Sequence, residues 1–105
     1  MKRDIAFNVE VAQEVGVECA VLLHHIVWWV HRNRLNDQNH HDGRYWTYNT
    51  YKTYAKLFPF WNVSKVKRLM KKLEAEGWIV SGNHNQLQFD RTRWYSTTNR
   101  TEQFY

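Results

Sequence analysis

Hydrophobic side chains recur at helical spacing through the first third of the chain. Asn8 can cap a short helix over Val9–Val15, and Gly16 can end it. From Val17 to about Asn33, apolar side chains cover most of the helical turn, which is typical of a helix at the centre of a core. The pattern therefore predicts that this second helix is the scaffold of the domain. Its only clearly polar stripe consists of Glu18, His25 and Arg32.

A polar segment and a short aromatic run follow this helix. The segment Asn33–Gly43 is rich in Asn, Asp and Gly, which favours a surface loop. The run Arg44–Tyr48 is rich in aromatic and β-branched side chains and predicts a strand. Asn49 can cap a helix over Thr50–Phe58, because apolar side chains recur there at helical spacing, and Pro59 ends it.

A second amphipathic helix and two strands complete the pattern. The helix is predicted over Val63–Glu76, with Asn62 as its cap and Gly77 at its end. Two helices joined by a turn of about four residues form a helix-turn-helix candidate. Strands predicted at Trp78–Val80 and Arg93–Thr97 then have the arrangement of a wing. The buried stripe of the helix consists of Val66, Leu69, Met70 and Leu73.

These elements predict one α+β domain. Its class is a winged helix-turn-helix with three to four helices and a small antiparallel β wing. The chain has 105 residues, 43% apolar and 24% charged, which suits a single globular domain with one core. We expect the domain to span residues 1–98 and the polar residues 99–105 to form a flexible tail.

The charge balance points to nucleic acid as a partner. Lys and Arg number 15 against 10 Asp and Glu, which leaves a net charge of +5 and a pI near 9.5. A basic balance in a small domain favours contact with phosphates. A basic surface that binds nothing would have the same net charge, so net charge alone does not distinguish it from a surface that binds nucleic acid.

Other features narrow the functional classes. A single cysteine, Cys19, excludes a disulfide scaffold and fits a reducing cytoplasm. No apolar run follows Met1–Asp4, so we expect no signal peptide. The longest apolar run, Ile26–Val30, is too short to span a membrane. We therefore expect a cytoplasmic protein with no membrane partner.

Histidine pairs raise the question of a metal site. His24 and His25 point about 100° apart on a helix and cannot readily share an ion, and His40 and His41 lie in a predicted loop. No pair of acids has catalytic spacing, and no glycine-rich phosphate loop is present. We expect no metal, no cofactor and no catalysis.

The charges on the predicted helix Val63–Glu76 are unevenly placed. Five of its fourteen residues are basic and lie in the first two-thirds, whereas both acids, Glu74 and Glu76, lie at the end. This order opposes the helix dipole but suits a recognition helix in the major groove. Arg68 can contact guanine, lysines suit phosphates, and Ser64 or Asn62 can touch a phosphate or base edge. An ordinary helix with a lysine-rich solvent face is the alternative. The DNA-binding candidates here are Asn62, Ser64, Lys65, Lys67, Arg68, Lys71 and Lys72.

Further cations surround this motif. Lys52 lies on the polar side of the first helix of the motif, near the place where this helix would cross the phosphate backbone of DNA. His84, Arg91 and Arg93 lie in or beside the predicted wing, which gives them access to DNA. An ion pair between Asp90 and Arg91 that holds a turn is the alternative for that position. Aromatic side chains expected in the core are Trp46, Tyr51, Tyr54, Phe58, Phe60, Trp61, Trp78 and Trp94.

Four stretches carry a family likeness: Gly43–Tyr51, Phe58–Trp61, Val66–Ile79 and Asp90–Tyr95. In this order the chain resembles the N-terminal winged-helix domain of phage and prophage replication initiator (replisome organiser) proteins, over roughly residues 15–98. The resemblance implies duplex DNA binding at a replication origin, in the cytoplasm of a bacterial host cell, with self-association to a homodimer. It places the recognition-helix positions at Asn62, Ser64, Lys65, Lys67, Arg68 and Lys71.

The chain departs from the family in length. Family members continue into a region that engages replication proteins, whereas this sequence stops at Tyr105. It is then either a fragment or a stand-alone winged helix, such as a phage regulator or a host-directed inhibitor of a CRISPR nuclease. An inhibitor would use the winged helix to bind protein. Its mark would be an exposed aromatic patch, such as Trp29 with Leu22, or Trp61.

Overall fold

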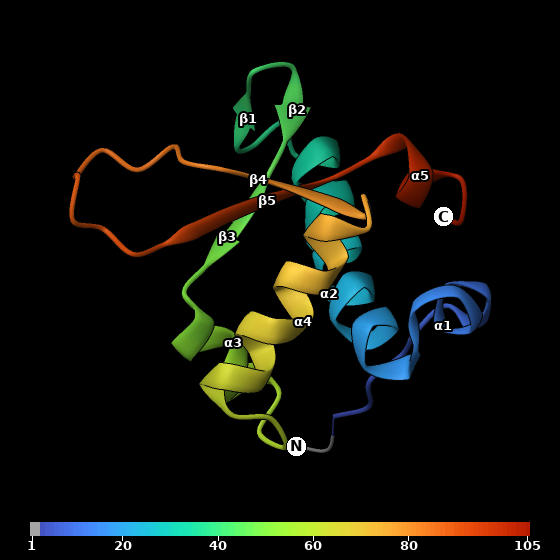
Figure 1. The fold of residues 1–105 in the computed structure, drawn as a ribbon. Helices are drawn as coiled ribbons and strands as arrows, with labels where there is room; N and C mark the ends of the chain where they lie inside the picture. The colour runs from blue at the N-terminus through green and yellow to red at the C-terminus, as the bar shows by residue number, and fades with distance from the viewer. Residues whose placement is uncertain (1–2) are drawn as a thin grey trace.

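The long helix α2 (Val17–Leu35) crosses the middle of the molecule and carries much of the core (Figure 1). The computed structural model describes residues 3–105. Helix α1 (Val9–Val15) leads directly into α2 because Gly16, with φ +90°, turns the chain between them. Asn8 caps α1, and its Oδ1 accepts a hydrogen bond from the Val11 amide at 3.0 Å. Both predicted helices are confirmed, and α2 ends two residues beyond its predicted end.

One position on α2 was wrongly expected on a polar stripe. Glu18 and Arg32 are exposed, but the His25 ring packs edge-on against Tyr54 and Phe58, with centroids 6.0 and 5.4 Å away. These ring contacts leave His25 half-buried, while the two outer members of the stripe are exposed to solvent.

The two predicted helices of the helix-turn-helix are α3 (Tyr51–Leu57) and α4 (Val63–Ala75). Asn62 caps α4 as expected, accepting from the Lys65 amide at 2.8 Å. The predicted cap of α3 was wrong. Thr50, not Asn49, accepts from the Thr53 amide at 3.1 Å, because Asn49 still belongs to a strand.

The aromatic turn between these helices is only partly buried. Phe58 is buried and Trp61 half-buried, but Phe60 is 60% exposed and was wrongly expected in the core. The other expected aromatic core positions, including Trp78 and Tyr54, are buried or half-buried.

A three-stranded antiparallel sheet joins distant parts of the chain. Its strands are β3 (Thr47–Asn49), β4 (Ile79–Gly82) and β5 (Arg93–Thr97), in the order β3-β5-β4. In register, Tyr48 pairs with Trp94 and Val80 with Ser96. The strand predicted at Trp78–Val80 begins one residue later and ends two residues later than expected, and the strand at Arg93–Thr97 is confirmed. In Figure 1 the β4–β5 hairpin projects from the body as a long loop.

The strand expected at Arg44–Tyr48 is divided in two. Its first part, β2 (Arg44–Tyr45), pairs with β1 (His40–His41) across an Asp42–Gly43 turn in which both φ angles are positive. Its second part is β3. The break falls at Trp46, whose buried indole donates from Nε1 to the His41 carbonyl at 2.9 Å.

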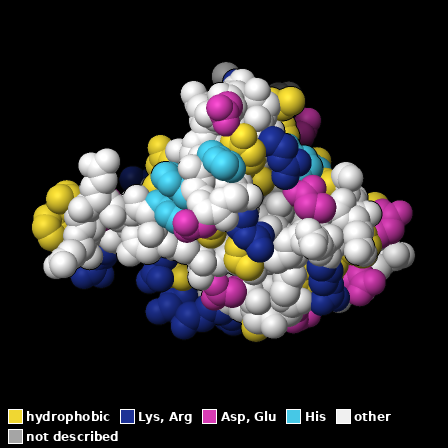
Figure 2. All heavy atoms as spheres, turned by 90° about the horizontal axis from the view of Figure 1, so that it is seen from above, with side chains coloured by type: hydrophobic (Ala, Val, Ile, Leu, Met, Phe, Trp, Pro, Cys, Tyr) yellow, Lys and Arg dark blue, Asp and Glu magenta, His cyan; other side chains and the backbone are white. Residues whose placement is uncertain are grey.

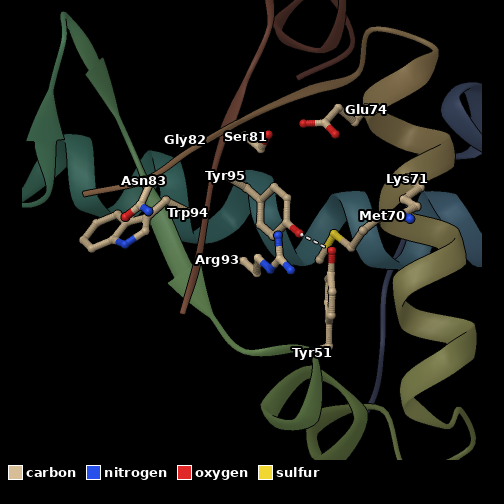
Figure 3. A pocket seen from close by; sticks show the side chains of 10 residues that line it. All are labelled: Tyr51, Met70, Lys71, Glu74, Ser81, Gly82, Asn83, Arg93, Trp94 and Tyr95. Carbon is tan, nitrogen blue, oxygen red and sulfur yellow. Dashed lines mark hydrogen bonds between the residues drawn. The ribbon is translucent and has the colours of Figure 1, made fainter. Parts of the chain in front are cut away.

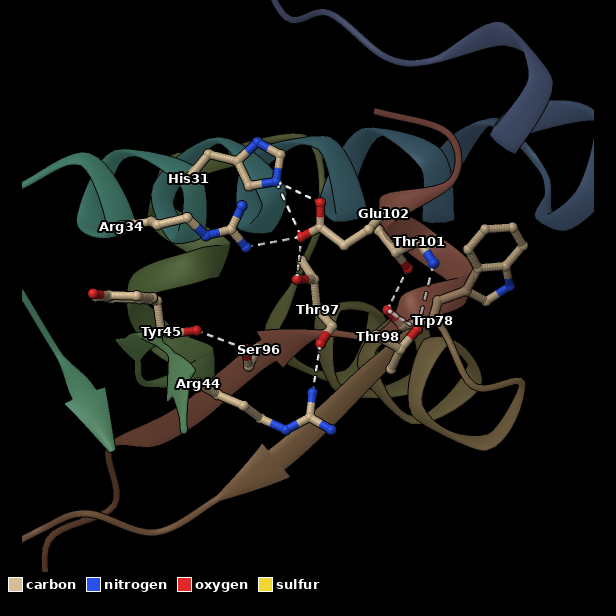
Figure 4. A network of polar contacts seen from close by, with 10 residues as sticks. All are labelled: His31, Arg34, Arg44, Tyr45, Trp78, Ser96, Thr97, Thr98, Thr101 and Glu102. Carbon is tan, nitrogen blue, oxygen red and sulfur yellow. Dashed lines mark hydrogen bonds and ion pairs between the residues drawn. The ribbon is translucent and has the colours of Figure 1, made fainter. Parts of the chain in front are cut away.

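The C-terminal residues 99–105, which we expected to form a flexible tail, pack against the rest of the domain instead. Residues Asn99–Glu102 form helix α5, capped by Thr98. Thr101 is fully buried, and its hydroxyl donates to the Trp78 carbonyl at 2.5 Å. Figure 4 shows Glu102 receiving hydrogen bonds from His31 and Thr97. A polar composition does not reveal such partners, because they lie on α2 and the sheet rather than nearby in sequence.

The fold is an α+β arrangement of five helices with a small antiparallel sheet, counted over residues 3–105. Its fifth helix exceeds the three to four that we predicted. The β4–β5 hairpin directly after α4 is compatible with a wing. In this described part of the chain, no helix combines the length and the apolarity needed to cross a bilayer.

Candidate nucleic-acid interface

Helix α4 turns one basic face to solvent. Its buried stripe packs on the core through Val66 and Leu73, which anchors the helix from end to end. The exposed side chains opposite the stripe are Ser64, Lys67, Arg68 and Lys71. These four predicted DNA-binding positions therefore form one continuous, accessible surface.

Two other predicted lysines on α4 face the N-terminal helices instead. Lys65 Nζ lies 2.8 Å from the Glu18 carboxylate, and this hydrogen bond is the main cause of the lowered pKa of Glu18. Lys72 Nζ donates to the Val15 carbonyl at 3.4 Å. The charge of Lys65 is thus balanced by a carboxylate of α2, and both side chains tie α4 to its neighbours.

A groove separates α3 and α4 from the β4–β5 hairpin. It has a volume of about 890 Å³ and is lined by four cations from three elements: Lys52, Lys67, Arg91 and Arg93. The only acidic side chain that lines it is Asp90. Seen from above, Lys and Arg side chains gather at the base of the projecting hairpin (Figure 2). The tertiary structure thus brings together cations that are up to 41 positions apart in the sequence, from Lys52 to Arg93.

Arg93 is positioned by an aromatic ring that sequence patterns did not single out for this purpose. Its guanidinium lies over the Tyr51 ring, 4.9 Å from the centroid, and the Tyr95 and Tyr51 hydroxyls are 3.5 Å apart (Figure 3). Burial is the main cause of the raised pKa of Tyr95, and the hydrogen bond with the Tyr51 hydroxyl raises it further. The Tyr95 phenol is therefore neutral. Figure 3 shows a second hollow beside the groove, lined by Tyr51 and Arg93 together with Lys71 and Glu74 of α4.

The carboxylate in the groove is held by the backbone of its own turn. Asp90 Oδ1 accepts from the Thr92 amide at 2.9 Å, and this hydrogen bond lowers the pKa of Asp90. The alternative of an Asp90–Arg91 ion pair is wrong for this structure, since no salt bridge joins the two within residues 3–105. The Arg91 guanidinium therefore remains available to a ligand.

His84, which the sequence places beside the wing, does not line the basic groove. Its ring stacks on His41 at 4.4 Å and lies edge-on to Trp46 at 4.7 Å. Its Nε2 is buried without a hydrogen-bond partner. Gly82 lies so close to this cluster that a Cβ added to it would come within 2.8 Å of the Trp46 ring. The cluster packs the base of the hairpin, and a role of His84 toward DNA stays a prediction.

A second exposed surface lies on α2. Trp28 is 51% exposed and Trp29 38%, with the two rings edge-on at 5.0 Å. Arg32 lies over the Trp28 ring at 5.4 Å. We call Trp28 and Trp29 the Trp pair. The expected companion of Trp29 was wrong, because Leu22 is fully buried.

Asn62 is the remaining predicted DNA-binding position on α4. The Asn62 side chain is used as the α4 cap, which leaves its role toward DNA a prediction. Among the residues that the structure describes, no group of three or more His, Cys, Asp or Glu side chains is placed to hold a metal ion.

Comparison of the chain with protein-family models, with curated proteins and with solved structures finds no match. The resemblance to replication initiators therefore stays a prediction that rests on the sequence motifs alone. The chain is an α+β protein with a basic groove between α3, α4 and the β4–β5 hairpin.

Proposed function

We propose that this chain is a winged helix-turn-helix domain that binds duplex DNA without catalysis. The observation that carries the proposal is the groove in which Lys52, Lys67, Arg91 and Arg93 meet a single carboxylate. A polyanion such as a duplex backbone is the ligand that this excess of positive charge attracts.

The order of elements supports this assignment. Helix α2 is followed by β3, by the helix pair α3 and α4, and by the hairpin β4–β5, and the returning strand β5 lies between the other two. In the proposed arrangement α4 enters the major groove and the hairpin lies along the neighbouring backbone.

The side chains then take different roles. Arg68, on the exposed face of α4, is the candidate for a bidentate contact to guanine, and Ser64 lies on the same face near the helix start. Lys67 and Lys71 neutralise phosphates beside them. Arg91 and Arg93 hold the backbone on the hairpin side of the groove, and Lys52 holds it on the α3 side.

The motif resemblance extends the proposal to a target. It would make the duplex a phage or plasmid replication origin and the working unit a homodimer. A single domain of this size covers only one half-site, so a dimer would supply the affinity that one half-site lacks.

Fluorescence anisotropy with a random duplex of about 30 bp tests the proposal. With about five phosphates contacted, log K should fall against log salt with a slope of about −4 to −5. Reversing the charges of Lys67, Arg68 and Lys71 to Glu should abolish binding while leaving the circular dichroism spectrum unchanged. Arg32→Glu, which reverses a charge beside the Trp pair, is the control and should bind nearly as wild type. Wild-type affinity in the triple variant would show that the assigned face is wrong.

The Trp pair favours a second candidate, a protein-interaction module such as a regulator or a host-directed inhibitor. Two neighbouring exposed tryptophans are the kind of anchor found at protein interfaces. Complex formation through them would depend little on salt and would be lost in a Trp28→Ser, Trp29→Ser variant. No duplex binding at low salt, with capture of a host protein that needs the Trp pair, would favour this candidate instead.

A further inference from the structure

The loop that joins β4 to β5 carries two exposed apolar side chains. Phe89 is 81% and Leu87 57% exposed. They belong to the loop that Figure 1 shows projecting from the body, and Figure 2 shows hydrophobic side chains at its far end. Exposed apolar groups of this size gain nothing from the core and point to a binding role.

The loop holds its shape without these two side chains. Asn85 donates from Nδ2 to the carbonyls of Asp90 and Thr92 at 3.2 and 2.9 Å, and its Oδ1 accepts from Trp94 Nε1 at 2.7 Å. A further bond joins the Asp90 amide to the Leu87 carbonyl at 3.2 Å. Polar contacts thus define the loop, so replacing Phe89 should leave the fold intact.

Phe89 also belongs to the basic groove. Its side chain lines the same hollow as Lys67 and Arg91. A ligand held by these cations therefore meets an aromatic ring at the outer end of the same surface. A duplex fits this sequence of contacts, because its phosphates are outermost and its apolar base stack lies behind them.

We propose that Phe89, supported by Leu87, is an apolar wedge that enters the minor groove of the bound duplex and bends it. The inference rests on the proposed duplex binding. Phe and Leu side chains that insert between base steps unstack them partly and kink the DNA toward the major groove. Gln88 precedes Phe89 in the loop and Arg91 follows it by two positions, and Gln and Arg side chains suit the minor groove. Flexible pyrimidine–purine steps should be preferred, because they kink most easily.

Ligase-catalysed circularisation of a DNA fragment of about 120 bp tests the wedge, because such a fragment is shorter than the persistence length of about 150 bp. Wild-type protein should raise the yield of circles about tenfold. A Leu87→Ser, Phe89→Ser variant should bind the duplex within about tenfold of wild type by anisotropy and give no increase in circles. Gln86→Ala, a change at an exposed position of the same loop that does not line the basic groove, is the control and should bend DNA as wild type does.

The possible failures are distinguishable. Salt-dependent binding of wild type without extra circles, or full circularisation by the double variant, overturns the wedge and leaves duplex binding intact. Absence of any duplex binding overturns both proposals. Tighter binding to a single-stranded 30-mer than to the duplex, lost in the Phe89→Ser variant, would assign the ring to unpaired bases and overturn the wedge.

Discussion

At the residue scale, some side chains that the sequence pattern places on the surface contact a neighbouring helix instead. His25 lies in a heptad-spaced polar stripe of the sequence but packs under α3. Lys65 belongs to the basic set of α4 but pairs with Glu18. In each case the side chain type was compatible with solvent, and only the neighbouring helix decided otherwise.

His25 should make the domain sensitive to acid. The pKa of His25 is lowered from 6.5 to about 4. Burial of the ring is the main cause, and the positive charges of Arg3 and His24 add to it. The unfolded state therefore takes up a proton before the folded state does as the pH falls. On account of His25, the free energy of unfolding should decrease by about 3 kcal/mol between pH 6.5 and pH 4 and change little at lower pH.

Urea denaturation at several pH values measures this effect. His25→Leu should remove most of the loss between pH 6.5 and pH 5. His24→Leu, the same change at the neighbouring histidine, is the control and should keep most of the loss, because His24 is the smallest of the causes that lower the pKa of His25. An identical pH profile for wild type and His25→Leu would contradict the assignment.

At the element scale, periodicity and capping residues located the helices well. Helices α1, α2, α3 and α4 lie within two residues of their predicted ends. The strands were harder, because a strand is defined by its partner: the run Arg44–Tyr48 divides between two sheets. Helix α5 was missed altogether, since its stability comes from contacts with Trp78, α2 and the sheet.

Thr101 should reveal how firmly α5 is docked. Its hydroxyl donates to the Trp78 carbonyl and has no exposed surface. Thr101→Val keeps the shape but removes the donor, so the free energy of unfolding should fall by about 1–3 kcal/mol. Asn99→Ala, at an exposed position of the same helix, is the control and should cost less than about 0.5 kcal/mol. Equal stability of the two variants in thermal or urea unfolding would mean that α5 is not docked as described.

At the scale of the whole molecule, binding and stability are assigned to different faces of α4. Lys67 faces the groove, whereas Lys65 faces Glu18. Because the Glu18 carboxylate is exposed to water, the Lys65–Glu18 pair should contribute little to the free energy of unfolding. The two lysines are chemically identical and two positions apart, so they make a matched pair for separating the two functions.

Under the proposed function, Lys67→Gln should weaken duplex binding several-fold and reduce the magnitude of the salt slope by about one unit. Lys65→Gln should change both much less and should lower the free energy of unfolding slightly. Anisotropy titrations over a range of salt, together with urea denaturation, measure both quantities. Equal loss of binding in the two variants would contradict the described orientation of α4.

The sequence by itself determined most of the helices, the cap of α4, the basic character of that helix and the hairpin after it, because these depend on local spacing and local hydrogen bonds. Only the tertiary structure decided which cations meet. It brought Lys52 and Lys67 beside Arg91 and Arg93, turned Lys65 and Lys72 away, and placed His84 in an aromatic cluster. The physical reason is that a helix pattern specifies which face is polar, whereas the packing of other elements decides which part of that face remains open to a ligand.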